Sequence, residues 1–116
     1  MAIEVLFTGV AVRDVSTAVA WYGALFGREP DVVPHEGEAM WRVSEGGWLY
    51  VVRDAEHAGH SIAALAVSDL DATLAELAAR GLHPGPAEPV GAAGRKSIAT
   101  DPDGNLVSLI EVAAAP

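Results

Sequence analysis

A turn that leads into a strand, found twice along the chain, constrains this 116-residue sequence more than any other feature. The run Asp101-Pro102-Asp103-Gly104 has the residues of a tight reversal, because proline fixes φ, aspartate bonds to the nearby backbone and glycine tolerates positive φ. The segment that follows, residues 106–112, is rich in branched apolar side chains and predicts a strand.

The second copy of this pattern lies in the first half of the chain. Residues 44–52 also run from a tight turn into an apolar strand, and the alignment places Trp48 on Leu106 and Tyr50 on Ser108. Residues 12–15 (VRDV) match residues 67–70 (VSDL) in the same way, each between an apolar run and a helical pattern. Because two copies are too few for a solenoid, they predict a duplicated unit packed around a pseudo-two-fold axis.

The predicted order of elements is strand, helix and three strands, repeated once. Apolar runs and turn residues predict strands over residues 4–12, 30–34, 39–43, 48–52, 61–67, 86–90, 95–100 and 105–112. Two helices are predicted between them. The first begins at a cap of Asp14 or Ser16 and ends near Gly27, and the second begins at a cap of Asp69 or Asp71 and ends near Gly81. The fold class is therefore α+β, with one domain over residues 1–116 built from modules at about 1–54 and 60–116.

Composition excludes several classes of protein. The sequence is 51% hydrophobic and 20% charged, as in ordinary globular proteins, and it has no apolar run long enough to span a membrane. A net charge of -9 disfavours nucleic acid as a partner. The absence of cysteine excludes disulfides, thiolate metal sites and a cysteine nucleophile, and with no visible signal peptide we expect a cytoplasmic protein.

The first hairpin gathers the aromatic residues. If residues 44–47 form a four-residue loop, Val43 faces Trp48 and Trp41 faces Tyr50 across the two strands. Alternation with a period of two then places all four side chains on one face of the sheet. This face is expected to line a pocket.

Three motifs resemble the vicinal oxygen chelate superfamily, which includes glyoxalases, bleomycin-resistance proteins, fosfomycin-resistance proteins and extradiol dioxygenases. They are Val12-Arg13-Asp14 with the helix after it, residues 67–72 (VSDLDA) and residues 101–105 (DPDGN), the last being the most specific. The resemblance implies two tandem βαβββ modules whose curled mixed sheets surround a concave cavity, and a homodimer as the usual assembly.

The resemblance also implies where a metal site would lie. Metal-dependent members carry His, Glu or Gln at four cavity positions, which correspond here to Phe7, Tyr50, Ile62 and Ser108. Phenylalanine and isoleucine have no lone pair for a divalent ion, so no metal and no cofactor are expected. A register slip of two residues would bring His60 to the third position, which is the remaining argument for a metal.

The expected pocket combines an apolar lining with few polar groups. Its predicted residues are Phe7, Trp41, Trp48, Tyr50, Ile62, Leu106 and Ile110, with Arg95, Ser97 and Ser108 as the polar groups. Such a concavity is typical of small-molecule sites. Together with the resemblance, it favours a metal-independent protein that looks most like the bleomycin-resistance type, which sequesters a drug or metabolite and gives antibiotic resistance. The alternatives are a metal-dependent lyase or dioxygenase, and a metal-free enzyme that uses Tyr50 or a rim carboxylate such as Glu36 or Glu38. The sequence leaves the ligand and any catalytic residue unidentified, and the cavity could lie within one chain or across a dimer.

Overall fold

The computed structural model describes residues 1–91 and 94–112, so the last four residues of the predicted second module lie outside it. Its elements are β1 (Leu6–Val12), α1 (Val15–Phe26), β2 (Val32–His35), β3 (Glu38–Ser44), β4 (Gly47–Arg53), β5 (Ile62–Ala66), α2 (Leu70–Ala79), β6 (Glu88–Val90), β7 (Gly94–Thr100) and β8 (Leu106–Val112). The predicted order of strand, helix and three strands, repeated once, is confirmed. None of the described helices is long and apolar enough to cross a membrane.

The helix ends follow the capping residues in the sequence. The carboxylate of Asp14 accepts a hydrogen bond from the Thr17 amide, and that of Asp69 accepts one from the Ala72 amide. Both therefore satisfy a backbone donor that the first helical turn leaves free. Gly27 ends α1 in the left-handed region at φ 73°, where a residue without Cβ is favoured.

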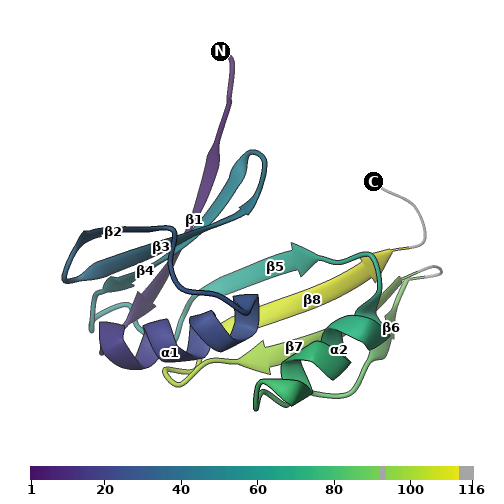
Figure 1. Cartoon of the computed structure of the whole chain (residues 1–116). Helices are drawn as coiled ribbons and strands as arrows, with labels where there is room; N and C mark the ends of the chain where they lie inside the picture. Colours follow the sequence, from purple (N-terminus) through teal and green to yellow (C-terminus); the bar gives the residue numbers. More distant parts are fainter. Residues whose placement is uncertain (92–93, 113–116) are drawn as a thin grey trace.

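Each module folds into a four-stranded mixed sheet with the same topology (Figure 1). The strand orders are β1-β4-β3-β2 and β5-β8-β7-β6. The first strand of each module pairs in parallel with the last, and the other neighbours are antiparallel. As a result β1 and β2 are the edges of the first sheet, and β5 and β6 are the edges of the second.

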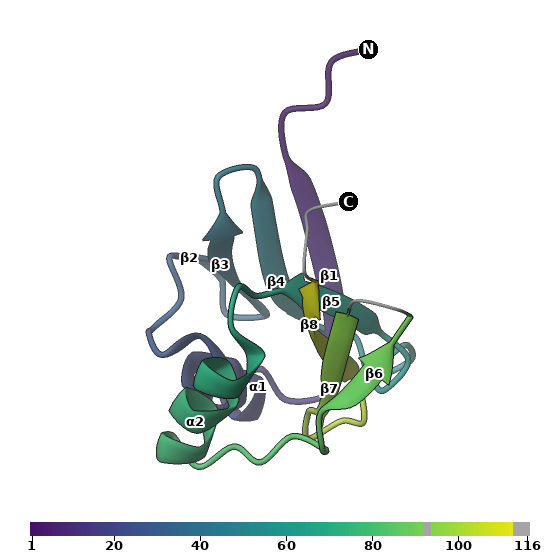
Figure 2. The ribbon, with the colours of Figure 1, turned by 90° about the vertical axis from the view of Figure 1, so that its right-hand side faces the viewer.

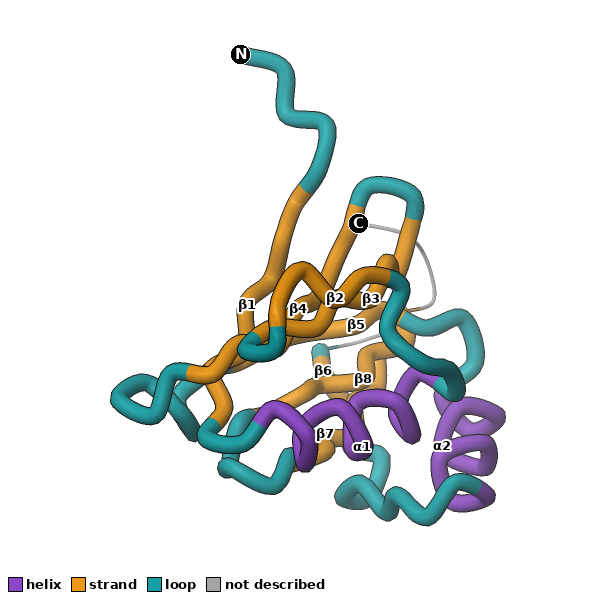
Figure 3. Tube along the Cα trace, turned by 60° about the vertical axis from the view of Figure 1, so that its left-hand side comes forward, coloured by secondary structure: helices purple, strands orange, loops and turns teal. Residues whose placement is uncertain are grey.

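The two helices lie in the angle between the two sheets and meet near their C-terminal ends (Figures 2 and 3). The guanidinium group of Arg80, at the end of α2, donates to the carbonyls of Ala24 and Leu25 in α1. The buried residues of both modules form a single cluster that includes Trp41, Leu77 and Val107. Each sheet therefore has an inner face, packed on the helices, and an outer face that is turned away from them.

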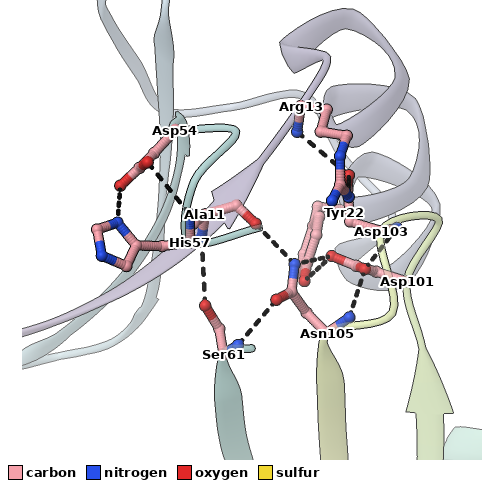
Figure 4. A network of polar contacts seen from close by, with 9 residues as sticks. All are labelled: Ala11, Arg13, Tyr22, Asp54, His57, Ser61, Asp101, Asp103 and Asn105. Atoms are coloured by element: carbon pink, nitrogen blue, oxygen red, sulfur yellow. Dashed lines mark hydrogen bonds and ion pairs between the residues drawn. The ribbon is translucent and has the colours of Figure 1, made fainter. Parts of the chain in front are cut away.

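A network of buried polar groups joins the two modules (Figure 4). The side-chain amide of Asn105 donates to the Ala11 carbonyl at 2.8 Å and to Asp101 at 2.9 Å, and its oxygen accepts from the Ser61 amide. The Ser61 hydroxyl in turn accepts from the Ala11 amide, and the Tyr22 hydroxyl donates to Asp101. Burial and the Asp101 carboxylate raise the pKa of Tyr22, so its phenol stays protonated as the donor.

Replacing Asn105 should be costly, because the side chain is 1% exposed and its partners would stay buried without it. We expect Asn105→Ala to lower the free energy of unfolding by about 2–3 kcal/mol, measured by denaturant titration. As a control, Arg13→Ala removes an ion pair to Asp103 between the same modules. The arginine side chain is 61% exposed, so this change should cost less than about 1 kcal/mol. Equal losses in the two variants would contradict a special role for the buried amide.

Candidate functional site

The outer face of the first sheet carries three neighbouring aromatic side chains. Phe7 on β1 is paired with Trp48 on β4, and their rings stack with centroids 6.3 Å apart and planes 29° from parallel. Tyr50 lies two residues further along β4, on the same face, opposite Gly9 of β1. Phe7 is 52% exposed although it is apolar, so this row is available for a contact that one chain does not supply.

The structure contradicts the prediction that Trp41 belongs to this face. Trp41 pairs with Leu49 rather than with Tyr50, because an irregularity in β3 between Arg42 and Ser44 shifts the hairpin by one residue. A shift of one residue turns a side chain to the opposite face. Trp41 is therefore 0% exposed on the inner face, where its indole N–H donates to the Arg28 carbonyl at 3.1 Å.

The outer face of the second sheet is mainly aliphatic. Four predicted site residues lie on it, because β5 and β8 pair in the register Ile62 with Leu106, Ala64 with Ser108 and Ala66 with Ile110. Ile98 of β7 is paired with Ser108 and belongs to the same face, although it was not among the predicted site residues. Alternation along β5 from Ile62 would have identified Ala64, whereas Ile98 depends on the register between β7 and β8, which the sequence placed one residue away. The side chain of Ile62 is 74% exposed.

The same kind of error affected Arg95 and Ser97, which the sequence had placed on the ligand side. Both lie on the inner face, where the Ser97 hydroxyl donates to the Gly85 carbonyl and Arg95 forms ion pairs with Asp71 and Glu111. The prediction assumed a four-residue loop. In the structure Thr100 pairs with Leu106, so Asn105 belongs to the loop and the register moves by one.

Four positions correspond to the metal ligands of the superfamily that the sequence resembles, and they lie on strands β1, β4, β5 and β8. They hold Phe7, Tyr50, Ile62 and Ser108, a set without imidazole or carboxylate donors, which does not fit a divalent metal ion. Elsewhere in residues 1–91 and 94–112, no group of three or more His, Asp or Glu side chains is placed to hold one.

Two of the four histidines each contact one acidic neighbour. His57 contacts Asp54 at 2.7 Å, and this hydrogen bond lowers the pKa of Asp54. His35 lies 3.4 Å from Glu38 at the hairpin of β2 and β3. His60 is exposed at the entrance of β5. These positions are separate, so they offer no shared site for an ion.

A cleft of about 540 Å³ opens on the inner side of the first sheet. Its walls are the start of β1, the end of β3, the start of β4 and the end of α1. The opposite wall is formed by residues 63–67, on β5 and just after it. Trp48 is the one predicted site residue that borders it. The cleft lies next to β5, an edge strand with no neighbour on one side. It is a different site from the predicted pocket on the outer faces.

Comparison with known proteins agrees with this architecture. The model of the glyoxalase/bleomycin resistance protein/dioxygenase superfamily matches residues 4–109. The chain belongs to this superfamily. A glyoxalase/bleomycin resistance protein from Catenulispora acidiphila is 45% identical, with 93% of this chain and 97% of that chain covered and a TM-score of 0.87.

Two more distant structures share the fold of this superfamily member. One is a bleomycin-binding protein from Streptomyces verticillus complexed with copper(II)-bleomycin, with 22% identity, coverage of 94% and 96%, and a TM-score of 0.77. The other is the antibiotic-binding protein TnmS3 from Streptomyces sp. CB03234, with 24% identity, coverage of 97% and 99%, and a TM-score of 0.76. None of the curated proteins compared with the chain matches it.

The two hairpin tryptophans should respond differently to truncation. We expect Trp41→Ala to cost about 3–5 kcal/mol of unfolding free energy, because it empties a buried site and removes a hydrogen bond. Trp48→Ala should cost about 1 kcal/mol, since it removes mainly a half-exposed stack on Phe7. Denaturant unfolding of both variants beside the wild type tests the register. Comparable losses would show that Trp48 is also part of the core.

Proposed function

We propose that this protein binds a planar or apolar small molecule on its outer sheet faces and sequesters it without chemical change and without a metal. The observation that carries the proposal is the row of Phe7, Trp48 and Tyr50 on the outer face, in which Phe7 is exposed and the other two side chains are half-buried. Aromatic rings favour stacked contacts with other rings, each contributing on the order of 1 kcal/mol beyond burial. The absence of cysteine fits a protein that works in the cytoplasm.

The chemistry of the outer faces supports binding over catalysis. A metal-dependent lyase or dioxygenase needs donors where Phe7 and Ile62 stand. A metal-free enzyme needs a nucleophile activated by a base within hydrogen-bond reach. Among the described polar contacts, neither the Tyr50 nor the Ser108 hydroxyl meets a carboxylate or an imidazole, and the rim carboxylate of Glu38 is held by His35.

The structural neighbours support a drug or metabolite as the ligand. One of the two Streptomyces proteins binds bleomycin, and the other is an antibiotic-binding protein. Because their identity to this chain is low, they suggest the class of ligand and leave its structure open. Antibiotic sequestration is therefore part of the proposal.

A second copy of the chain is expected to complete the binding site. Within one chain the helices fill the angle between the sheets, so the two outer faces point away from each other. A cavity that uses both faces must take one from each of two copies. We therefore propose that the site lies across a homodimer.

The edge strands support the same arrangement. Edge strands β2 and β6 contain Pro34 and Pro89, and proline protects an edge because it cannot donate a ladder hydrogen bond. Edge strands β1 and β5 contain no proline and expose Phe7 and Ile62. Pairing β1 of one copy with β5 of the other would join an aromatic outer face to an aliphatic one, and two-fold symmetry would repeat the contact.

The binding proposal predicts a ligand-dependent change in tryptophan fluorescence. In a screen that includes bleomycin in metal-free and copper-loaded forms, Trp48→Ala should weaken binding of any hit about tenfold or more, because 1.4 kcal/mol is tenfold. Trp21→Phe serves as the control, since Trp21 lies on α1 away from the outer face. Calorimetry with and without a chelator should give the same Kd, and mass spectrometry should recover the ligand unchanged.

Two results would contradict this function. One is a hit whose binding depends on a stoichiometric metal in the protein. The other is conversion of the ligand into a product, which would indicate an enzyme.

The dimer proposal predicts a mass near 24 kDa by sedimentation, twice the 12.0 kDa of the chain. Ile62→Lys should produce monomers that still fold, as circular dichroism would show, because the side chain is exposed within one chain. The matched control is Ala75→Lys on the exposed side of α2. A monomeric wild type, or dissociation of both variants, would exclude the proposed contact.

A further inference from the structure

Gly9 lies directly beneath the ring of Tyr50 on the outer face of the first sheet. A methyl group built on Gly9 would lie 2.5 Å from both Cζ and the hydroxyl oxygen of Tyr50, closer than real Cβ atoms approach other heavy atoms. The ring of Tyr50 therefore reaches from β4 across β1 and occupies the place of the missing side chain. Its hydroxyl lies above β1, the edge strand, rather than above β4.

The backbone gives no separate reason for glycine at this position. The glycines with positive φ are at residues 27, 59, 81, 91 and 104 of the described chain, and Gly9 is not among them. Gly9 instead lies inside the regular parallel ladder of β1 and β4. Glycine in a strand interior costs about 0.5–1 kcal/mol relative to alanine and often marks a close approach of another group.

The second module shows the alternative at the same place. There Ala64 pairs with Ser108, at the positions that correspond to Gly9 and Tyr50. Serine is too short to cross the neighbouring strand, and that strand carries a methyl group. The small residue and the long phenol of the first module therefore occur together.

The hydroxyl of Tyr50 is available to a ligand. Among the hydrogen bonds of the described residues none uses it, and Tyr50 is half-buried rather than enclosed. Arg42, on the same face, donates to the Glu45 carbonyl through Nε and Nη2. A phenol hydroxyl donates one proton, so it suits a ligand with an acceptor atom.

From this geometry we propose that Gly9 determines ligand specificity, by letting Tyr50 lie across β1 with its hydroxyl beside the Phe7–Trp48 stack. The site then takes planar aromatic molecules that carry a hydrogen-bond acceptor at the ring edge. This inference rests on the proposed binding function and names the ligand class of the same site. Gly9 acts through Tyr50 and is a positioning residue.

A matched pair of probes tests the ligand class. Naphthalene and isoquinoline have nearly the same shape, but only isoquinoline has a ring nitrogen that accepts a hydrogen bond. Both are titrated by NMR, at a pH where the nitrogen is neutral, into wild type, Gly9→Ala, Tyr50→Phe and the control Gly23→Ala. Gly23 lies in α1, and a methyl group there would meet its nearest atom, the Arg28 carbonyl oxygen, at an ordinary 3.5 Å.

A second measurement follows the tyrosine without any ligand. The chain has two tyrosines, so a spectrum of ¹³C-tyrosine-labelled protein contains the ring signals of Tyr22 and Tyr50 alone. Gly9→Ala should shift the Tyr50 signals and leave those of buried Tyr22 in place. Because the displaced atoms are the end of a side chain, the variant should fold. Unshifted Tyr50 signals would overturn the role of Gly9.

The two probes separate this inference from the function on which it rests. We expect wild type and Gly23→Ala to bind isoquinoline about fivefold more tightly than naphthalene, as one neutral hydrogen bond provides. Gly9→Ala and Tyr50→Phe should lose this preference, so the ratio of the two affinities falls to about one in both variants. Equal binding of both probes by wild type, or a preference that survives in Gly9→Ala, overturns the inference while the aromatic site stands. Binding of neither probe by wild type overturns both.

Discussion

The buried amide of Asn105 is the contact on which the arrangement of this molecule depends. It joins β1 of the first module to the start of β5 and to the turn before β8 in the second. A primary amide has two donors and an acceptor, and all of them are used here by groups from both modules. Apolar packing alone is not directional, whereas these bonds fix one relative orientation.

That orientation has consequences for the rest of the surface. With the helices enclosed between the sheets, the inner faces share a single core and the outer faces are left to solvent. The exposed apolar side chains Phe7 and Ile62 lie at the two edge strands without proline. The cleft along residues 63–67, on β5 and just after it, lies beside one of these edges. An unpaired edge and an apolar patch in one place indicate a surface for association.

The sequence was sufficient for the architecture and insufficient for the strand faces. Matching residues 44–52 to 102–110 correctly paired the modules, because duplication keeps equivalent residues at equivalent places: Trp48 lies beside Phe7 as Leu106 lies beside Ile62. The faces of Trp41, Arg95 and Ser97 depended on counting loop residues. An irregularity in β3 shifted the register of the first hairpin by one residue. In the second hairpin, buried hydrogen bonds hold Asn105 in the loop, which lengthens the loop by one residue.

Comparison of the modules explains how a nearly symmetric scaffold can give an asymmetric binding surface. In the first module the paired positions hold Phe7 with Trp48 and Gly9 with Tyr50, and in the second they hold aliphatic or small residues. The differences are coupled, since the phenol of Tyr50 needs the space above Gly9. A large side chain on one strand is therefore compatible with close packing only where the neighbouring strand has no side chain. A two-fold dimer that joins unlike faces would set an aromatic wall against an aliphatic one in each of two equal sites. A flat ligand could then stack on one wall while the other excludes water.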